Sequence, residues 1–192
     1  MHLEGEPATV DLMDGITDRW AGYEGGDEIA TQLDVVIEKF DSRRPGQSVP
    51  ALLAVKQALA ALPSGNVIVA EKRAQLDVIL AASIGLYVEA TVANARVAPG
   101  EALKVSHRVV QREPSTVAVT WQGIRYLAEN QTVAVNRTLR LNENETVEGE
   151  RNLPMDPALT PPYWLELPST AGMARVTDAS LIGTPENEAA YP

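Results

Sequence analysis

The residues best suited to catalysis or metal binding are few and scattered in this chain. Its 192 residues include two histidines, His2 and His107, and no cysteine. A structural zinc ion typically needs about four histidine, cysteine or carboxylate ligands close together, and two isolated histidines cannot make a histidine-rich site. Without cysteine the chain has no thiolate nucleophile, no iron–sulfur ligand and no disulfide. The sequence therefore predicts no metal site and no bound cofactor.

Serine chemistry and phosphate binding also lack their usual sequence contexts. A Ser-His-Asp hydrolase would have to use His107, yet no serine of the chain lies in a Gly-x-Ser-x-Gly elbow. Neither a Gly-x-x-x-x-Gly-Lys loop nor a Gly-x-Gly-x-x-Gly motif is present. His107 lies in a run that alternates apolar and polar residues, so we expect a strand residue whose ring is at the sheet surface or satisfied in the core. The chain is not expected to be an enzyme by itself.

Paired carboxylates are the one catalytic arrangement that the sequence leaves open. The chain has 26 acidic residues, and a glycosidase needs only a pair of them several ångströms apart. The densest acidic run, Glu143, Glu145, Glu148 and Glu150 around Gly149, is typical of a solvated loop. We therefore interpret these acids as a surface feature.

Aromatic residues are the remaining candidates for a binding site. Trp20, Trp121 and Trp164 could stack on sugar rings if exposed, but tryptophan in a small β-sandwich is more often a buried anchor. Tyr163 and Trp164 are adjacent, so in a strand they would point to opposite faces, with Tyr163 and Leu165 in the core and Trp164 outward. The sequence thus singles out Tyr163 and Trp164 as candidate contacts for a neighbouring domain or for a glycan.

The charge of the chain excludes some classes of partner. Its formal net charge is −10, which repels nucleic-acid phosphates and anionic lipids. No apolar run reaches the roughly 18 residues of a membrane span, and Met1 to Val10 does not resemble a secretion signal. Nucleic acid and membrane are therefore not expected as partners, while the cellular compartment stays open.

The N-terminal part of the chain has the apolar spacing of helices. Residues 28–41 form one periodic run, with Asp27 as a plausible N-cap. A second run follows Ser48 and extends to Leu62, and a third covers 67–84, before Gly85. These runs predict about three helices that pack as an antiparallel segment over residues 1–85.

After Gly85 the apolar period changes to the alternation of strands. Turn signals such as Pro99-Gly100 and Pro114-Ser115 separate the runs. The strand-like runs lie at 86–93, 103–111, 117–121, 132–141, 163–167 and 173–177. Short strands without an intervening helical period predict an antiparallel immunoglobulin-like β-sandwich over 86–192, and an α+β class for the whole chain.

Three short runs resemble a known family. Gly85-Leu86-Tyr87-Val88-Glu89-Ala90, Pro-Tyr-Trp-Leu at 162–165 and Ile-Gly-Thr-Pro-Glu-Asn at 182–187 are similar, in this order, to the region downstream of the catalytic domain in large LmbE-like (PIG-L family) deacetylases. The resemblance implies a helical linker followed by a β-sandwich. In that family a separate N-terminal domain carries the zinc-binding His-Pro-Asp-Asp-Glu run and removes acetyl groups from N-acetylated sugars.

None of the family's catalytic motif occurs in this chain, which has no Asp-Asp pair. The resemblance therefore implies a non-catalytic middle region, a fragment of a longer protein, whose partner is the rest of its parent polypeptide. It also implies an extracytoplasmic setting. One alternative is a carbohydrate-binding module that raises the local concentration of glycan at the catalytic domain.

Overall fold

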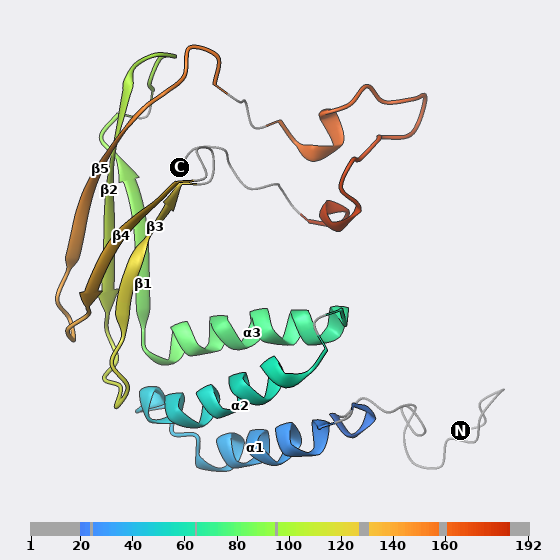
Figure 1. Ribbon diagram of the computed structural model, residues 1–192, viewed down its shortest axis with the longest axis vertical. Helices are drawn as coiled ribbons and strands as arrows, with labels where there is room; N and C mark the ends of the chain where they lie inside the picture. Colours follow the sequence, from blue (N-terminus) through green and yellow to red (C-terminus); the bar gives the residue numbers. More distant parts are fainter. Residues whose placement is uncertain are drawn as a thin grey trace. The chain divides into compact units, whose positions relative to one another are not determined.

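A computed structural model describes residues 20–23, 25–63, 65–94, 96–126, 131–157 and 161–184 (Figure 1). Its helices are α1 (Gly26–Lys39), α2 (Val49–Ala61) and α3 (Val67–Ser83). Its strands are β1 (Leu86–Val92), β2 (Ala102–Gln111), β3 (Thr120–Tyr126), β4 (Gln131–Thr138) and β5 (Glu145–Asn152). Helices followed by antiparallel strands confirm the α+β class, whereas the immunoglobulin-like topology stays a prediction. No helix in the described ranges is long and apolar enough to cross a membrane.

The chain divides into two compact units. The helical unit comprises residues up to Leu86 together with Gln111–Ala118, and the β unit comprises Tyr87–Val110 and the residues from Val119 onward. The helical unit therefore contains a segment that follows β2 in the sequence. The predicted division at 85/86 does not include this return of the chain.

Local signals explain where each helix begins. The sequence predicts Asp27 as the N-cap of α1, but the N-cap is Gly25, with φ of 82°. Asp27 therefore lies in the first turn of the helix. A carboxylate in the first turn still interacts favourably with the helix dipole. Asn66 caps α3, because its side-chain oxygen accepts hydrogen bonds from the backbone N–H groups of Ile68 and Val69 at 2.9 and 3.2 Å.

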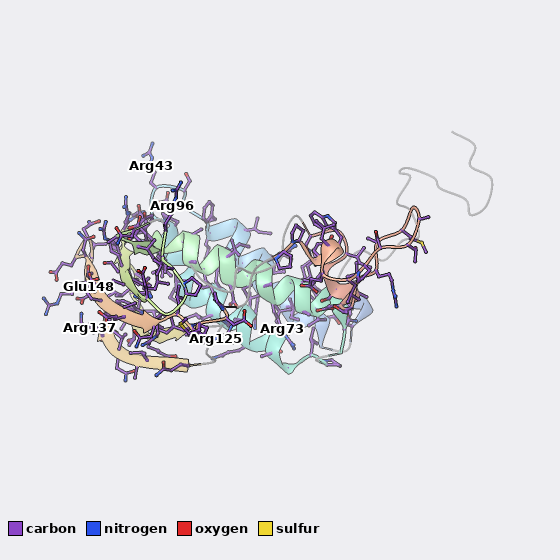
Figure 2. All side chains as sticks on the ribbon, turned by 90° about the horizontal axis from the view of Figure 1, so that it is seen from above. Arg43, Arg73, Arg96, Arg125, Arg137 and Glu148 are labelled. Atoms are coloured by element: carbon purple, nitrogen blue, oxygen red, sulfur yellow. The ribbon has the colours of Figure 1, made fainter. Side chains whose placement is uncertain are left out.

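The helical unit is built around α2, which lies between α1 and α3 (Figure 1). Its buried core comprises Ile29, Leu52, Val55, Leu59, Leu62, Val69 and Leu76. Arg73 of α3, labelled in Figure 2, donates through Nε and Nη2 to the carbonyl of Leu59 at 3.1 and 2.6 Å, and through Nη2 to that of Leu62 at 2.8 Å. One cation thus adds charged donors at the C-terminal end of α2, where the Leu59 carbonyl also accepts from the backbone N–H of Leu62 at 3.2 Å.

Residues 111–118 pack against the C-terminal end of α3 and against Gly46, which precedes α2. The backbone N–H groups of Arg112 and Glu113 donate to the carbonyls of Gly85 and Ile84 at 3.1 and 3.0 Å. Gly46 approaches Pro114 so closely that a Cβ atom at this position would overlap the Pro114 carbonyl oxygen. Only glycine fits here without a shift of the backbone.

The β unit contains a sheet with strand order β1-β2-β5 and a second sheet formed by β3 and β4. In β2 the side chains alternate between faces, as strand geometry requires. Leu103, Val105, His107 and Val109 are buried on one face, while Lys104 and Arg108 are exposed on the other. Antiparallel pairing places Val105 opposite Gly149 and His107 opposite Val147 of β5.

The β3–β4 pair contains a β-bulge. Its register shifts between Trp121, which pairs with Arg137, and Gly123, which pairs with Ala134. Asn136 lies within the shifted stretch with φ of 51°, a left-handed conformation that asparagine tolerates better than most residues. The bulge therefore has a local sequence cause.

One loop prediction and two strand predictions need correction. The interpretation of the acidic run as a solvated loop is wrong for 145–152, which form β5. The predicted strand at 163–167 is wrong, because Tyr163–Leu165 form a 3-10 helix. The predicted strand at 173–177 is reduced to a single bridge between Thr170 and Met173. The loop assignment rested on the density of acidic residues, and the two strand assignments rested on alternation, which does not distinguish a strand from a tight turn over so few residues.

Candidate functional site

The structure changes the expected arrangement of Tyr163 and Trp164. Their rings make an edge-to-face pair with centroids 4.8 Å apart and an interplanar angle of 88°. Tyr163 is buried, Trp164 is 37% exposed, and Leu165 is 64% exposed rather than sharing the buried side of Tyr163. The strand geometry that put Tyr163 and Leu165 together in the core is therefore wrong, but Trp164 is still the more exposed of the aromatic pair.

Hydrogen bonds hold this aromatic pair within the segment 161–184. The Tyr163 hydroxyl donates to the carbonyl of Thr184 at 3.3 Å, which joins the two ends of the segment. Asp178 caps a short turn by accepting from the N–H and hydroxyl groups of Ser180 at 2.9 and 2.6 Å. The Ser180 hydroxyl, and next its N–H, lower the pKa of Asp178 below its usual value of 3.8. These contacts order a loop and do not activate a reacting group.

A second cluster lies between the two sheets of the β unit. His107 is buried, its Nδ1 lies 3.2 Å from the carbonyl of Val147, and its ring meets Tyr126 edge-on with centroids 5.4 Å apart. Arg151 covers the Tyr126 ring at 3.9 Å from its centroid. His107 is thus a core residue with a satisfied Nδ1, as one of the two sequence interpretations expected.

The acidic residues Glu148 and Glu150 of β5 make exposed side-chain contacts with β2. Glu148 accepts a hydrogen bond from Ser106 at 2.7 Å, and Glu150 lies 3.8 Å from Lys104. These side chains point to the outer face of the sheet formed by β1, β2 and β5. Within the described ranges no three histidine, aspartate or glutamate side chains come close enough to hold a metal ion. Their arrangement is that of solvated surface pairs, which contribute little to stability.

The helical unit has a groove that the sequence did not indicate as a site. Its volume is about 290 Å³, and it is lined by Trp20, Leu33, Val55, Leu59, Lys72, Gln75, Leu76 and Ile79. Lys72 donates to the side-chain oxygen of Gln75 at 3.0 Å, and Gln75 donates to Glu71 at 2.8 Å. The lining is otherwise apolar, which is typical of pockets that bind a ligand or a partner.

The outward side of α3 is apolar as well. Val67 is 81% exposed and Val78 is 69% exposed, and both lie on the side of the helix opposite its packing against α2. Large apolar side chains this exposed are candidates for contact with a partner. The periodic run from Val67 to Ile84 predicts the helix but does not single out Val67 or Val78 as exposed.

Comparisons with protein-family models, curated proteins and solved structures find no significant match. The function of the chain must therefore be argued from its own residues. The features that carry such an argument are the uncovered apolar faces of the helical unit and the half-exposed Trp164.

Proposed function

We propose that this chain is a non-catalytic accessory region that packs on neighbouring domains of a larger LmbE-like (PIG-L family) N-acetyl-sugar deacetylase. The observation that carries the proposal is the apolar outward face of α3, with Val67 and Val78 both largely exposed. Burying such side chains against another domain removes apolar surface from water, at roughly 25 cal/mol per Å². The three short sequence runs that resemble the family support this choice of parent.

We include in this proposal an immunoglobulin-like sandwich for the β unit. Alternating burial along β2 gives the β1-β2-β5 sheet an apolar face, and His107 on that face contacts Tyr126 of β3. Two antiparallel sheets that share a core in this way are compatible with a sandwich scaffold. Such a scaffold would hold the two neighbouring domains of the parent at a set distance.

Association with the catalytic domain tests the accessory function. The chain, mixed with the separately purified deacetylase domain of its parent protein, should give a saturable titration in calorimetry. Val78→Asp should weaken this binding about tenfold or more, because it places a charge in an apolar contact. The control is Gln57→Asp, which adds the same charge at an exposed position of α2. Absence of any association, or equal binding by the Val78→Asp protein, would contradict the proposal.

A carbohydrate-binding module is the second candidate, and the exposed part of Trp164 is the observation that favours it. Under the accessory proposal, N-acetylglucosamine oligomers bind neither the native chain nor Trp164→Ala. The substitution then lowers the stability of the segment by about 1 kcal/mol, the typical contribution of an aromatic pair. Isothermal titration with these oligomers measures glycan binding, and hydrogen exchange of residues 161–184 measures the stability of the segment. A glycan affinity that Trp164→Ala abolishes would establish the binding module instead.

A further inference from the structure

The groove of the helical unit lies where a fourth helix would pack in a four-helix bundle. Its floor is formed by Val55 and Leu59 of α2, and its sides by Leu33 of α1 and Ile79 of α3. Both outer helices pack on α2 and make few contacts with each other, which leaves the space above α2 open. An arrangement of this kind corresponds to a four-helix bundle that lacks one helix.

We propose that the groove receives a single amphipathic α-helix from a neighbouring domain, with acidic side chains along the edge that faces Lys72. This inference rests on the proposed function and names the kind of element that docks. Helix-in-groove recognition uses apolar anchors at i, i+4 and i+7, and a volume of about 290 Å³ accommodates roughly three such side chains.

The length of the stripe that α3 presents beside the groove, with an isoleucine at each end and two polar residues between them, favours a helix over a small ligand. Ile68, Lys72, Gln75 and Ile79 follow one another at helical spacing along α3, and the groove is lined by the last three of them. Ile68 and Ile79 are both about half exposed. The stripe spans 11 residue steps, or about 17 Å at the helical rise of 1.5 Å. A small molecule in the groove would leave Ile68 uncovered, whereas a helix lying along α3 covers the whole stripe.

The charge of the groove indicates the partner's charge. Lys72 is the one charged residue among those that line the groove, and its ammonium group makes a hydrogen bond to the neutral side chain of Gln75. An acidic helix edge complements this cation.

Designed peptides test this docking on the full chain. Two amphipathic helical peptides, each roughly three heptads long, carry leucine at the core positions and either glutamate or lysine beside them. The glutamate peptide should bind the native chain more tightly. Lys72→Glu should weaken it by roughly threefold to fivefold and favour the lysine peptide, as expected for an exposed ion pair. Ile79→Asp should weaken both peptides about tenfold, and Gln57→Asp should change neither.

The outcomes separate the groove from the wider proposal. No binding of either peptide, or binding that Ile79→Asp leaves unchanged, overturns the docking of a helix. Decanoate that saturates the groove when neither peptide binds assigns it to a small amphiphile instead, and also overturns the inference. If the deacetylase domain binds the Ile79→Asp protein with native affinity, the groove is not the docking site, but the accessory function is still supported. If Ile79→Asp fails to fold, the change of peptide preference in Lys72→Glu decides the question, because Lys72 is an exposed residue.

Discussion

Gly149→Val should destabilise the β unit by about 3 kcal/mol, at the upper end of the range for overpacked cores. Gly149 lies in the middle of β5, and a Cβ atom at this position would overlap the hydroxyl oxygen of Tyr126 and lie 3.4 Å from Cε1 of His107. The Tyr126 ring cannot easily move away, because His107 meets it edge-on and Arg151 covers it. The added side chain therefore has to separate the two sheets.

Thermal unfolding measures this effect. A loss of this size corresponds to a fall in Tm of roughly 6–12 °C for a chain of this length. Glu150→Val is the matched control, because the same side chain is introduced one position along β5 on the exposed face, where a change within about 0.5 kcal/mol is expected. A Gly149→Val protein that melts with the control would show that the two sheets do not pack through Tyr126.

Arg73→Met should have the second largest effect and should act on the helical unit. Methionine keeps the length of the aliphatic stem but leaves the carbonyls of Leu59 and Leu62 without their charged donor. Hydrogen bonds to charged groups contribute about 1.5–3 kcal/mol. The Leu59 carbonyl keeps the backbone N–H of Leu62 as a donor at 3.2 Å, so the substitution removes the charged donor but not every donor at this helix end. We expect a loss of about 2 kcal/mol.

Chemical denaturation followed by far-ultraviolet circular dichroism, which reports mainly on the helices, provides the measurement. Lys72→Met is the control, because Lys72 is the adjacent residue, is exposed, and donates only to the side chain of Gln75. It should change stability by about 0.5 kcal/mol or less. Equal stability of the two variants would show that the interaction of Arg73 with the end of α2 contributes nothing to the fold.

The helices were predictable from sequence because several of their ends have a local signal. Pro63 follows α2, Asn66 caps α3, and Gly85 ends the helical region with φ of 56°. Apolar residues at a spacing of three and four then identify the faces. Predicted and observed bounds agree within about two residues, which is the usual uncertainty at helix ends.

The β unit was harder to predict because its decisive contacts are long-range. Gly149 and the surrounding glutamates have low strand propensity, and β5 exists because Val147 and Gly149 pair with β2, some 40 residues earlier in the chain. The groove was missed for a related reason. Leu33 and Ile79 have the spacing of core residues, and only the positions of three helices show that the space between them is unfilled.

The return of residues 111–118 to the helices has a consequence for synthesis on the ribosome. The carbonyls of Ile84 and Gly85 accept from Glu113 and Arg112, and Gly46 lies against Pro114, and these three partners all follow β2 in the chain. When α3 leaves the exit tunnel, the helical unit therefore still lacks its last segment and must wait for roughly 30 more residues, a few seconds at bacterial translation rates. During this interval the first two strands emerge between two parts of one folding unit. Completion of the helices and formation of the β2 strand are thus linked in time, and a pause in translation before residue 118 would leave both unfinished.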